Sequence, residues 1–309
     1  MNHMAFLFPG QGSQAVGMGK DFYESSSLAR EIFARADESL GYSITKLCLE
    51  GPEADLRLTQ NTQPALLTVS TIAYKLFGRV PQIAAGHSLG EYSALVAAGA
   101  ISFEDAVLLV HKRGTYMQEA VPVGTGAMAA VLGASHEKIK EVVQAVRGGI
   151  VEVANWNSKE QIVIAGDDLA VKEALSLLNP PRSVMLPVSA PFHCQLMVSA
   201  EEKLSYDLNQ IEFKDLRFPI ITNVDAKIIL KGDQARDSLR RQVTRTVLWY
   251  SSMEVMGKQN IDVYIELGAG KVLSGLAKRI AREWPNSPTL LNVEDMASLE
   301  RTNKALDEM

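Results

Sequence analysis

One serine lies in a five-residue pattern that is typical of a nucleophile turn. Residues 86–90, Gly-His-Ser-Leu-Gly, fit G-x-S-x-G between an apolar run at 81–86 and an alanine-rich run at 92–99. Glycine at both ends permits a tight strand-to-helix turn that projects the Ser88 hydroxyl into a cleft, with the N–H of Leu89 as an oxyanion donor. The alternative is a serine that only caps the helix. The context favours acyl chemistry at Ser88 and leaves the capping role open.

A serine nucleophile needs a base, and the chain has five histidines. His193 follows a predicted strand and a proline-containing turn, where a second predicted domain rejoins the first. A loop at a domain junction suits a cleft residue, so His193 is the first candidate. His111, on the helix predicted over 105–120, is the second. The remaining histidines are less suited by position: His3 near the chain start, His87 as the neighbour of Ser88, and His136 at a polar helix start.

Arg113 lies on the apolar side of the helix predicted over 105–120. It falls between Leu109 and Met117 at four-residue steps, so we expect its guanidinium to be buried. A buried cation is costly without an anion, and a guanidinium binds a carboxylate through two parallel N–H donors. Two partners stay open at this point: an acidic side chain of the protein, or a carboxylate of the substrate.

Two glycine-containing turns follow predicted strands. Residues 9–14, PGQGSQ, lack the Lys-Ser/Thr of a P-loop, and residues 268–271, GAGK, are too short a match for a nucleotide site. We interpret 9–12 as a loop that supplies a second backbone donor to an oxyanion.

Alternating apolar runs and amphipathic stretches predict an α/β fold with a mainly parallel sheet. Strands are expected at 5–8, 81–86, 218–224 and 261–268, and helices at 21–40, 63–77, 105–120, 197–209, 234–243 and 271–282. Residues 127–188 instead follow the order βαββαβ, the ferredoxin-like pattern. We therefore predict a larger domain formed by 4–124 and 192–309, with 125–191 inserted as a small domain.

Composition limits the class of protein. The 309 residues are 47% hydrophobic and 22% charged, the net charge is −5, and neither a basic run nor an apolar run of membrane-spanning length occurs. We expect no nucleic-acid partner and no membrane span. Cys48 and Cys194 form no CxxC, which favours reduced thiols over a disulfide framework or a zinc site. No secretory pattern is present, so we expect a cytoplasmic protein, and we expect a monomer.

Several segments together resemble the malonyl-CoA:acyl carrier protein transacylases over nearly the whole chain. In chain order they are FPGQGSQ (8–14), TQPAL (62–66), GHSLGEYSAL (86–95), RGTYMQ (113–118), GAMAAVLG (126–133), ANWNS (154–158), VSAPFHC (188–194) and ELGAGKVLSGL (266–276). This series is far more specific than the serine pattern alone. The resemblance implies an α/β-hydrolase-like core with a ferredoxin-like insertion, in agreement with the predicted elements.

The resemblance also implies the catalytic roles. Ser88 would accept the acyl group, and His193 would be its base, oriented by the backbone carbonyl of Gln242. The backbone N–H groups of Gln11 and Leu89 would form the oxyanion hole.

Further residues would select the acyl group. The resemblance assigns the malonyl carboxylate to Arg113, with Gln63 as a polar cleft residue. Phe192 matches the malonyl-selecting pattern, because an aromatic ring leaves little room for an α-methyl group. Met117, within the RGTYMQ segment, is expected to contribute to the same selectivity.

The predicted reaction transfers a malonyl group from malonyl-CoA to the phosphopantetheine thiol of an acyl carrier protein, through a malonyl-Ser88 ester. It would serve fatty-acid or polyketide synthesis and would need no bound cofactor and no metal. Two alternatives stay open. One is a serine acyl hydrolase or thioesterase that acts on acyl carrier protein or CoA thioesters, and the other is a non-catalytic carrier-binding module.

Overall fold

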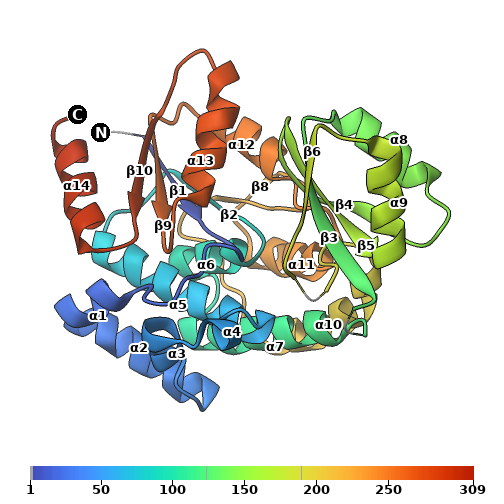
Figure 1. The fold of residues 1–309 in the computed structure, drawn as a ribbon. Helices are drawn as coiled ribbons and strands as arrows, with labels where there is room; N and C mark the ends of the chain where they lie inside the picture. Colours follow the sequence, from blue (N-terminus) through green and yellow to red (C-terminus); the bar gives the residue numbers. More distant parts are fainter. Residues whose placement is uncertain (1–2, 123, 189) are drawn as a thin grey trace.

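The computed structural model describes residues 3–122, 124–188 and 190–309, and these form two sheets. The larger sheet lies at the left of Figure 1 and the smaller one at the right. In spatial order the larger sheet contains β10 (Thr289–Val293), β9 (Val263–Leu267), β1 (Met4–Phe8), β2 (Ile83–Gly86), β7 (Ile220–Ile221) and β8 (Ile228–Ile229). All neighbouring pairs are parallel except β7 with β8. The prediction of a mainly parallel sheet is confirmed.

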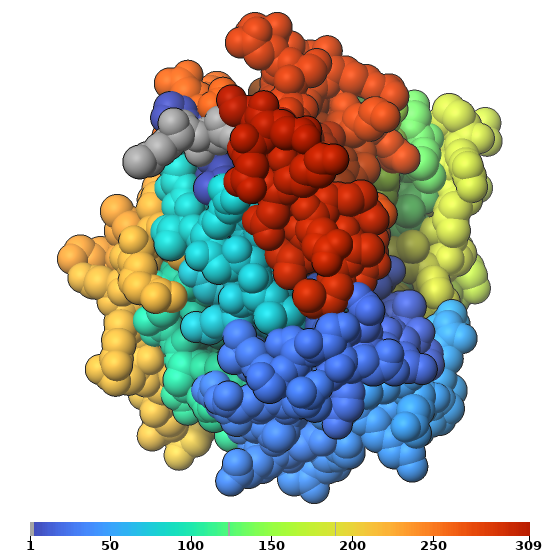
Figure 2. Space-filling view, turned by 90° about the vertical axis from the view of Figure 1, so that its left-hand side faces the viewer, coloured from blue at the N-terminus to red at the C-terminus, as the bar shows by residue number. Residues whose placement is uncertain are grey.

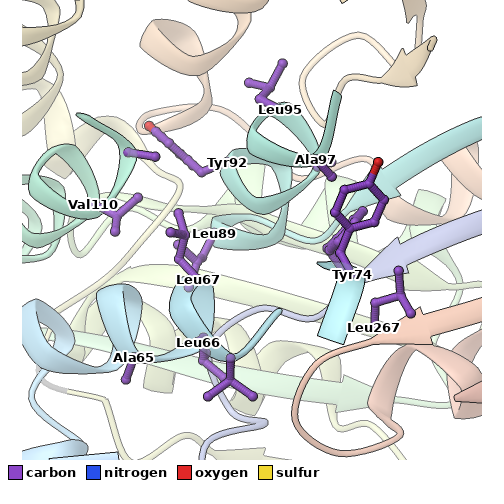
Figure 3. Packing of buried hydrophobic residues seen from close by; sticks show 14 of the residues in the cluster. Ala65, Leu66, Leu67, Tyr74, Leu89, Tyr92, Leu95, Ala97, Val110 and Leu267 are labelled. Carbon is purple, nitrogen blue, oxygen red and sulfur yellow. The ribbon is translucent and has the colours of Figure 1, made fainter. Parts of the chain in front are cut away.

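One face of the larger sheet packs on a helical layer. Phe6 and Phe8 of β1 enter a core that also contains apolar side chains of α5 (Thr59–Phe77) and α6 (Leu89–Ala98). Figure 3 shows part of this core, with side chains from both helices. Pro64 falls in the first two turns of α5, and α6 begins directly after Ser88. This layer therefore fixes where the serine turn meets the helices.

The opposite face packs on two other helices. Ala5 and Leu7 of β1 point to this side because strand residues alternate between faces. They join a second core with α12 (Trp249–Gly257) and α13 (Val272–Ile280). The sheet is thus buried on both faces, as parallel sheets require.

The other helices complete the larger unit. They are α1 (Lys20–Ser25), α2 (Ser27–Leu40), α3 (Ile44–Glu50), α4 (Glu53–Leu56), α7 (Phe103–Glu119), α10 (Val198–Gln210), α11 (Gly232–Gln242) and α14 (Met296–Asp307). Short 3₁₀ turns occur at Gln195–Met197 and Ala281–Glu283. Figure 2 shows α14, in red, beside α5 in cyan and the blue N-terminal helices.

Two local predictions differ from the structure, and several elements were not predicted. The helix expected at 21–40 is two helices, because the Ser26 hydroxyl caps α2 by accepting from the Ala29 N–H at 3.3 Å. The strand expected at 218–224 is only Ile220–Ile221. The sequence analysis gave no prediction for six elements, which are α3, α4, α12, α14, β8 and β10.

The smaller sheet is antiparallel, in the order β4-β5-β3-β6. Its elements are β3 (Gly126–Leu132), α8 (His136–Ala145), β4 (Val151–Ser158), β5 (Gln161–Asp167), α9 (Asp168–Leu178) and β6 (Arg182–Met185). Ala129 and Val131 of β3 face α8 and α9, whereas Met128 and Ala130 face the main core. This is the predicted βαββαβ order, and the α/β fold class with a second, smaller sheet is confirmed.

The exact domain boundaries stay a prediction. Positions 123 and 189, near the two predicted junctions, lie outside the described residues. Among the described helices, none is both long enough and apolar enough to cross a membrane.

Candidate active site

Ser88 occupies the tight turn between β2 and α6. Its backbone has φ 52° and ψ −106°, a conformation that non-glycine residues rarely adopt. The flanking glycines make the turn possible by close approach. A Cβ on Gly86 would lie 1.8 Å from the carbonyl carbon of Gly90, and a Cβ on Gly90 would lie 1.9 Å from the carbonyl oxygen of Phe8. Strand, turn and helix can meet this closely only with glycine at both positions.

The Ser88 hydroxyl contacts the first of the two candidate histidines. Ser88 Oγ lies 2.8 Å from His193 Nε2, and His193 Nδ1 lies 2.8 Å from the backbone oxygen of Gln242. Since a carbonyl only accepts hydrogen bonds, Nδ1 carries the proton. Nε2 is then left as an acceptor for the serine proton, which is the tautomer that a general base needs.

The second candidate, His111, lies elsewhere. Its Nδ1 contacts the backbone oxygen of Gln60 at 3.0 Å and the Tyr42 hydroxyl at 3.4 Å, in a separate hollow. His111 therefore does not meet Ser88.

The imidazole of His193 is neutral at physiological pH. Burial, followed by the charge of Arg113, lowers the pKa of His193 to about 3, although its hydrogen bond to the Gln242 carbonyl opposes the shift. A neutral imidazole that contacts a hydroxyl can accept its proton.

Arg113 is buried, as predicted, and it reaches the serine. Its side chain is 2% exposed. Nη1 donates to Gln63 Oε1 at 2.7 Å, and Nη2 donates to Gln242 Oε1 at 2.9 Å and to Ser88 Oγ at 3.1 Å. These acceptors are all neutral, and Nε has no acceptor within the described part of the chain. The guanidinium thus lies beside the hydroxyl with its charge unpaired by an acidic side chain at hydrogen-bond distance.

The predicted site residues converge on one cavity. Apart from Gln242, all of them line a cavity of about 100 Å³. Gln242 is fully buried and contacts both Arg113 and His193. Residues that are far apart in sequence therefore share one small volume.

Two backbone amides of this cavity are unpaired. Gln11 and Leu89 both line it, and among the described residues neither backbone N–H has a hydrogen-bond acceptor. Free N–H donors of this kind are what a developing oxyanion requires.

Apolar side chains form the remainder of the predicted wall. Phe192 and Met117 are buried and line the cavity, and Gln63 Nε2 lies 3.9 Å from the Met117 sulfur. Both side chains therefore form part of the apolar lining of the cavity.

The contribution of the smaller sheet to the cavity was not predicted from the sequence. Met128 of β3 and Asn155 of β4 line the cavity, and Asn157 Oδ1 lies 2.8 Å from His87 Nε2. The segment ANWNS contained the signal, because asparagines two residues apart on a strand share one face.

Comparison with known proteins identifies the family. The model of the acyl transferase domain matches residues 5–290. A relative from Escherichia coli strain K12, the malonyl CoA-acyl carrier protein transacylase, is 47% identical over 288 residues, which are 91% of this chain and 93% of the relative. The chain belongs to the malonyl CoA-acyl carrier protein transacylase family. The resemblance seen in the sequence motifs is confirmed.

Other transacylases are similar over their whole length. The Bacillus subtilis transacylase is 43% identical, with 100% of this chain and 98% of the relative covered. The Coxiella burnetii transacylase structure has a TM-score of 0.95 and 39% identity, covering 99% of this chain and 98% of that one. A malonyl-transacylase solved in complex with a type II PKS acyl-carrier protein has a TM-score of 0.94 and 41% identity, covering 98% of this chain and 100% of that one.

Proposed function

We propose that this acyltransferase moves a malonyl group from malonyl-CoA to the phosphopantetheine thiol of an acyl carrier protein, through an ester on Ser88. One observation carries the proposal. The Ser88 hydroxyl lies 2.8 Å from a neutral imidazole and 3.1 Å from a guanidinium whose hydrogen-bond acceptors are neutral. The names of the relatives support the same reaction.

In the first half-reaction, the malonyl carboxylate binds Arg113 and places the thioester carbonyl beside Ser88. Oγ attacks this carbonyl while His193 Nε2 takes the hydroxyl proton. The N–H groups of Gln11 and Leu89 stabilise the oxyanion, and the loss of one such donor typically costs about 10²–10³ in rate. The carbon–sulfur bond then breaks, and the CoA thiolate leaves with the proton from His193. A malonyl-serine ester remains.

The second half-reaction reverses these steps with a different thiol. The carrier thiol gives its proton to His193 Nε2 and attacks the ester carbonyl, held by the same two amides. The bond from the carbonyl carbon to Ser88 Oγ breaks, and Oγ regains a proton from His193. This scheme requires ping-pong kinetics.

Two glutamines and two apolar side chains complete the proposed roles. Gln242 orients His193 through its carbonyl and Arg113 through its side chain, and Gln63 holds the other nitrogen of the guanidinium. Phe192 would restrict an α-methyl substituent, and Met117 would limit the space beside Gln63.

A serine acyl hydrolase would use the same serine, histidine and amides. The relatives named above are transacylases and do not support that alternative. The guanidinium beside Ser88 also favours a substrate with a free carboxylate, because simple acyl hydrolysis does not need a buried cation.

The experiment is intact-mass analysis of the protein after mixing with malonyl-CoA, followed by addition of a holo acyl carrier protein. We expect one malonyl adduct on the parent protein, its transfer to the carrier, and no adduct on the Ser88→Ala variant. A normal adduct on that variant would refute the assignment. Release of free malonate at the same rate with and without carrier would instead indicate a hydrolase.

The cellular setting is part of the same proposal. A relative solved with a type II PKS acyl-carrier protein supports a carrier as partner, and we propose a role in fatty-acid or polyketide synthesis. We further propose a cytoplasmic monomer that works without a bound cofactor, and light scattering on the purified chain tests the monomer.

A further inference from the structure

Asn223 contacts the backbone on both sides of His87. It follows β7, the parallel neighbour of β2, so both strands end at the same edge of the sheet. Its side chain is fully buried. Oδ1 accepts from the Ser88 N–H at 2.7 Å, and Nδ2 donates to the Gly86 carbonyl at 2.7 Å. One amide thus bridges the last residue of the strand and the nucleophile.

Asn223 is itself held in place by the first turn of α6. Its backbone N–H donates to Glu91 Oε2 at 3.0 Å, and the Glu91 N–H donates to the Ser88 carbonyl at 3.1 Å. Gln242 Nε2 contacts the same Glu91 oxygen at 2.8 Å, the Ser88 carbonyl at 3.1 Å and Asn223 Oδ1 at 3.3 Å. These bonds form a closed ring around the turn, in which the Asn223 amide, the Glu91 carboxyl group and the Ser88 backbone groups all have partners.

The turn needs such support because its backbone is strained. A serine at φ 52° and ψ −106° persists only where its surroundings over-determine the conformation. The close approaches at Gly86 and Gly90 exclude other residues at these positions, but they provide no hydrogen-bond acceptor for the Ser88 N–H. Among the described residues, the Asn223 side chain alone accepts from that N–H. Without it, a buried donor would lose its acceptor and the turn would relax.

We propose that Asn223 is a positioning residue, which clamps the strained turn so that the Ser88 hydroxyl stays within reach of His193. Asn223 contacts backbone groups and Gln242, and it does not line the cavity. It therefore acts through Ser88 rather than on the substrate. This inference rests on the proposed acylation of Ser88.

The test measures single-turnover formation of the malonyl adduct by quenched mixing and intact mass. Asn223→Ala removes both bonds, and we expect acylation to slow by about 10- to 100-fold, the range expected for a displaced reacting group. The malonyl-CoA concentration that gives half of the maximal single-turnover rate should stay within about twofold of the parent value, since the hydroxyl and not the carboxylate site is displaced. Asn223→Asp keeps the acceptor for Ser88 and loses the donor to Gly86, so we expect a smaller loss of about fivefold.

Ser252→Ala is the matched control. Ser252 is equally buried near the same strand end. Its hydroxyl donates to the backbone carbonyls of Leu248 at 3.0 Å and Thr222 at 3.5 Å, and within the described part of the chain it makes no hydrogen bond to Ser88 or to the Asn223 side chain. We expect a lower melting temperature for this variant and an acylation rate within about twofold of the parent rate.

Three results would overturn the proposal that Asn223 positions the Ser88 turn. One is parent-like acylation by Asn223→Ala, and another is equal slowing of Ser252→Ala at the same loss of melting temperature. If Asn223→Ala does not fold, a parent-like rate for Asn223→Asp decides against the clamp. A parent protein that forms no adduct would overturn the proposed function as well, whereas a parent adduct with unaffected variants would overturn only this inference.

Discussion

The two walls of the cavity are built in different ways. On the wall formed by the larger sheet and its helices, Ser88, Arg113, His193 and Gln242 are joined by hydrogen bonds of 2.8–3.1 Å. The wall formed by the smaller sheet contributes side chains such as Met128, and none of its described residues forms a hydrogen bond with the serine hydroxyl. The difference indicates that the reacting groups are positioned by the larger unit, while the smaller unit shapes the space beside them.

The smaller sheet also has two unequal edges. At the β4 edge, Trp156 N–H donates to the Val247 carbonyl and Val247 N–H donates to the Ala154 carbonyl, both at 2.9 Å. This pairing ties the sheet to the segment that follows Gln242. At the other edge, β6 is exposed along its whole length. Changes on the β4 side should therefore reach the site, and changes on β6 should not.

The largest effect should come from the wall that holds the reacting groups. In Arg113→Ala, we expect kcat/KM for malonyl-CoA to fall by about 10²–10³, because two charge-assisted hydrogen bonds to the carboxylate are lost. Transfer from acetyl-CoA, which has no carboxylate, should rise. Steady-state kinetics with both substrates measures this. Arg113→Lys keeps the charge and loses the two-pronged geometry, so an intermediate loss is expected, and equal losses on both substrates would mean that the arginine is only structural.

A smaller effect is expected on the choice between malonyl and methylmalonyl groups, and it should distinguish the two walls. In Phe192→Ser, we expect the ratio of methylmalonyl to malonyl transfer to rise by about tenfold, since one methyl group in a close-fitting site commonly changes specificity by this order. Competition between the two CoA esters measures the ratio. Leu186→Ala, which lines the same cavity and follows β6 of the smaller sheet, is the control and should change the ratio less. A larger change of the ratio in Leu186→Ala than in Phe192→Ser would mean that the smaller unit, and not the larger one, selects the acyl group.

The pH dependence tests the electrostatics of the catalytic wall. With a pKa near 3 in the folded protein, His193 should be neutral from pH 5.5 to 7, and kcat/KM should change by less than about twofold. A histidine with the ordinary pKa of 6.5 would lose about tenfold at pH 5.5. In Arg113→Ala, the decrease of kcat/KM at acid pH should begin at a higher pH, because the positive charge that lowers the pKa of His193 is gone. A decrease of kcat/KM with a midpoint near pH 6.5 in the parent protein would contradict the prediction that His193 is a buried, neutral base.

The same shift has a consequence for stability. A group with a depressed pKa binds fewer protons in the folded chain than in the unfolded chain. Its contribution to the free energy of unfolding is therefore complete above pH 6.5 and is lost as the pH falls toward 3.

The smallest effect is expected at the contact between the walls. Asn157→Ala removes the 2.8 Å bond to His87, and we expect kcat/KM to fall by about two- to fivefold, the range of one hydrogen bond. Val184→Thr on the exposed β6 edge is the control and should leave kcat/KM unchanged. A loss for Asn157→Ala as large as that of Arg113→Ala would place catalytic positioning on the smaller sheet and remove the contrast between the walls.

Local sequence predicted much of this arrangement. The tight turn at Ser88 follows from two glycines and a serine between a strand and a helix, and the burial of Arg113 follows from its four-residue spacing to Leu109 and Met117. The βαββαβ order of the smaller unit was equally visible, because strand and helix periodicities depend on neighbouring residues. Predictions were weaker where packing decides, as in the short strand β7, and they missed one local signal, the cap at Ser26 that divides the first helix.

By itself, the sequence determined the residue types, the serine turn and the series of motifs that identifies the family. Tertiary structure decided that His193 and not His111 meets the serine, that the acceptors around Arg113 are neutral, and that Asn223 holds the turn. Ser88 is 105 residues from His193 and 135 from Asn223. Groups so distant along the chain have no local pattern in common. Ser88 and Asn223 meet because the parallel strands β2 and β7 end at one edge of the larger sheet, whereas His193 reaches the serine from the loop that follows the smaller sheet.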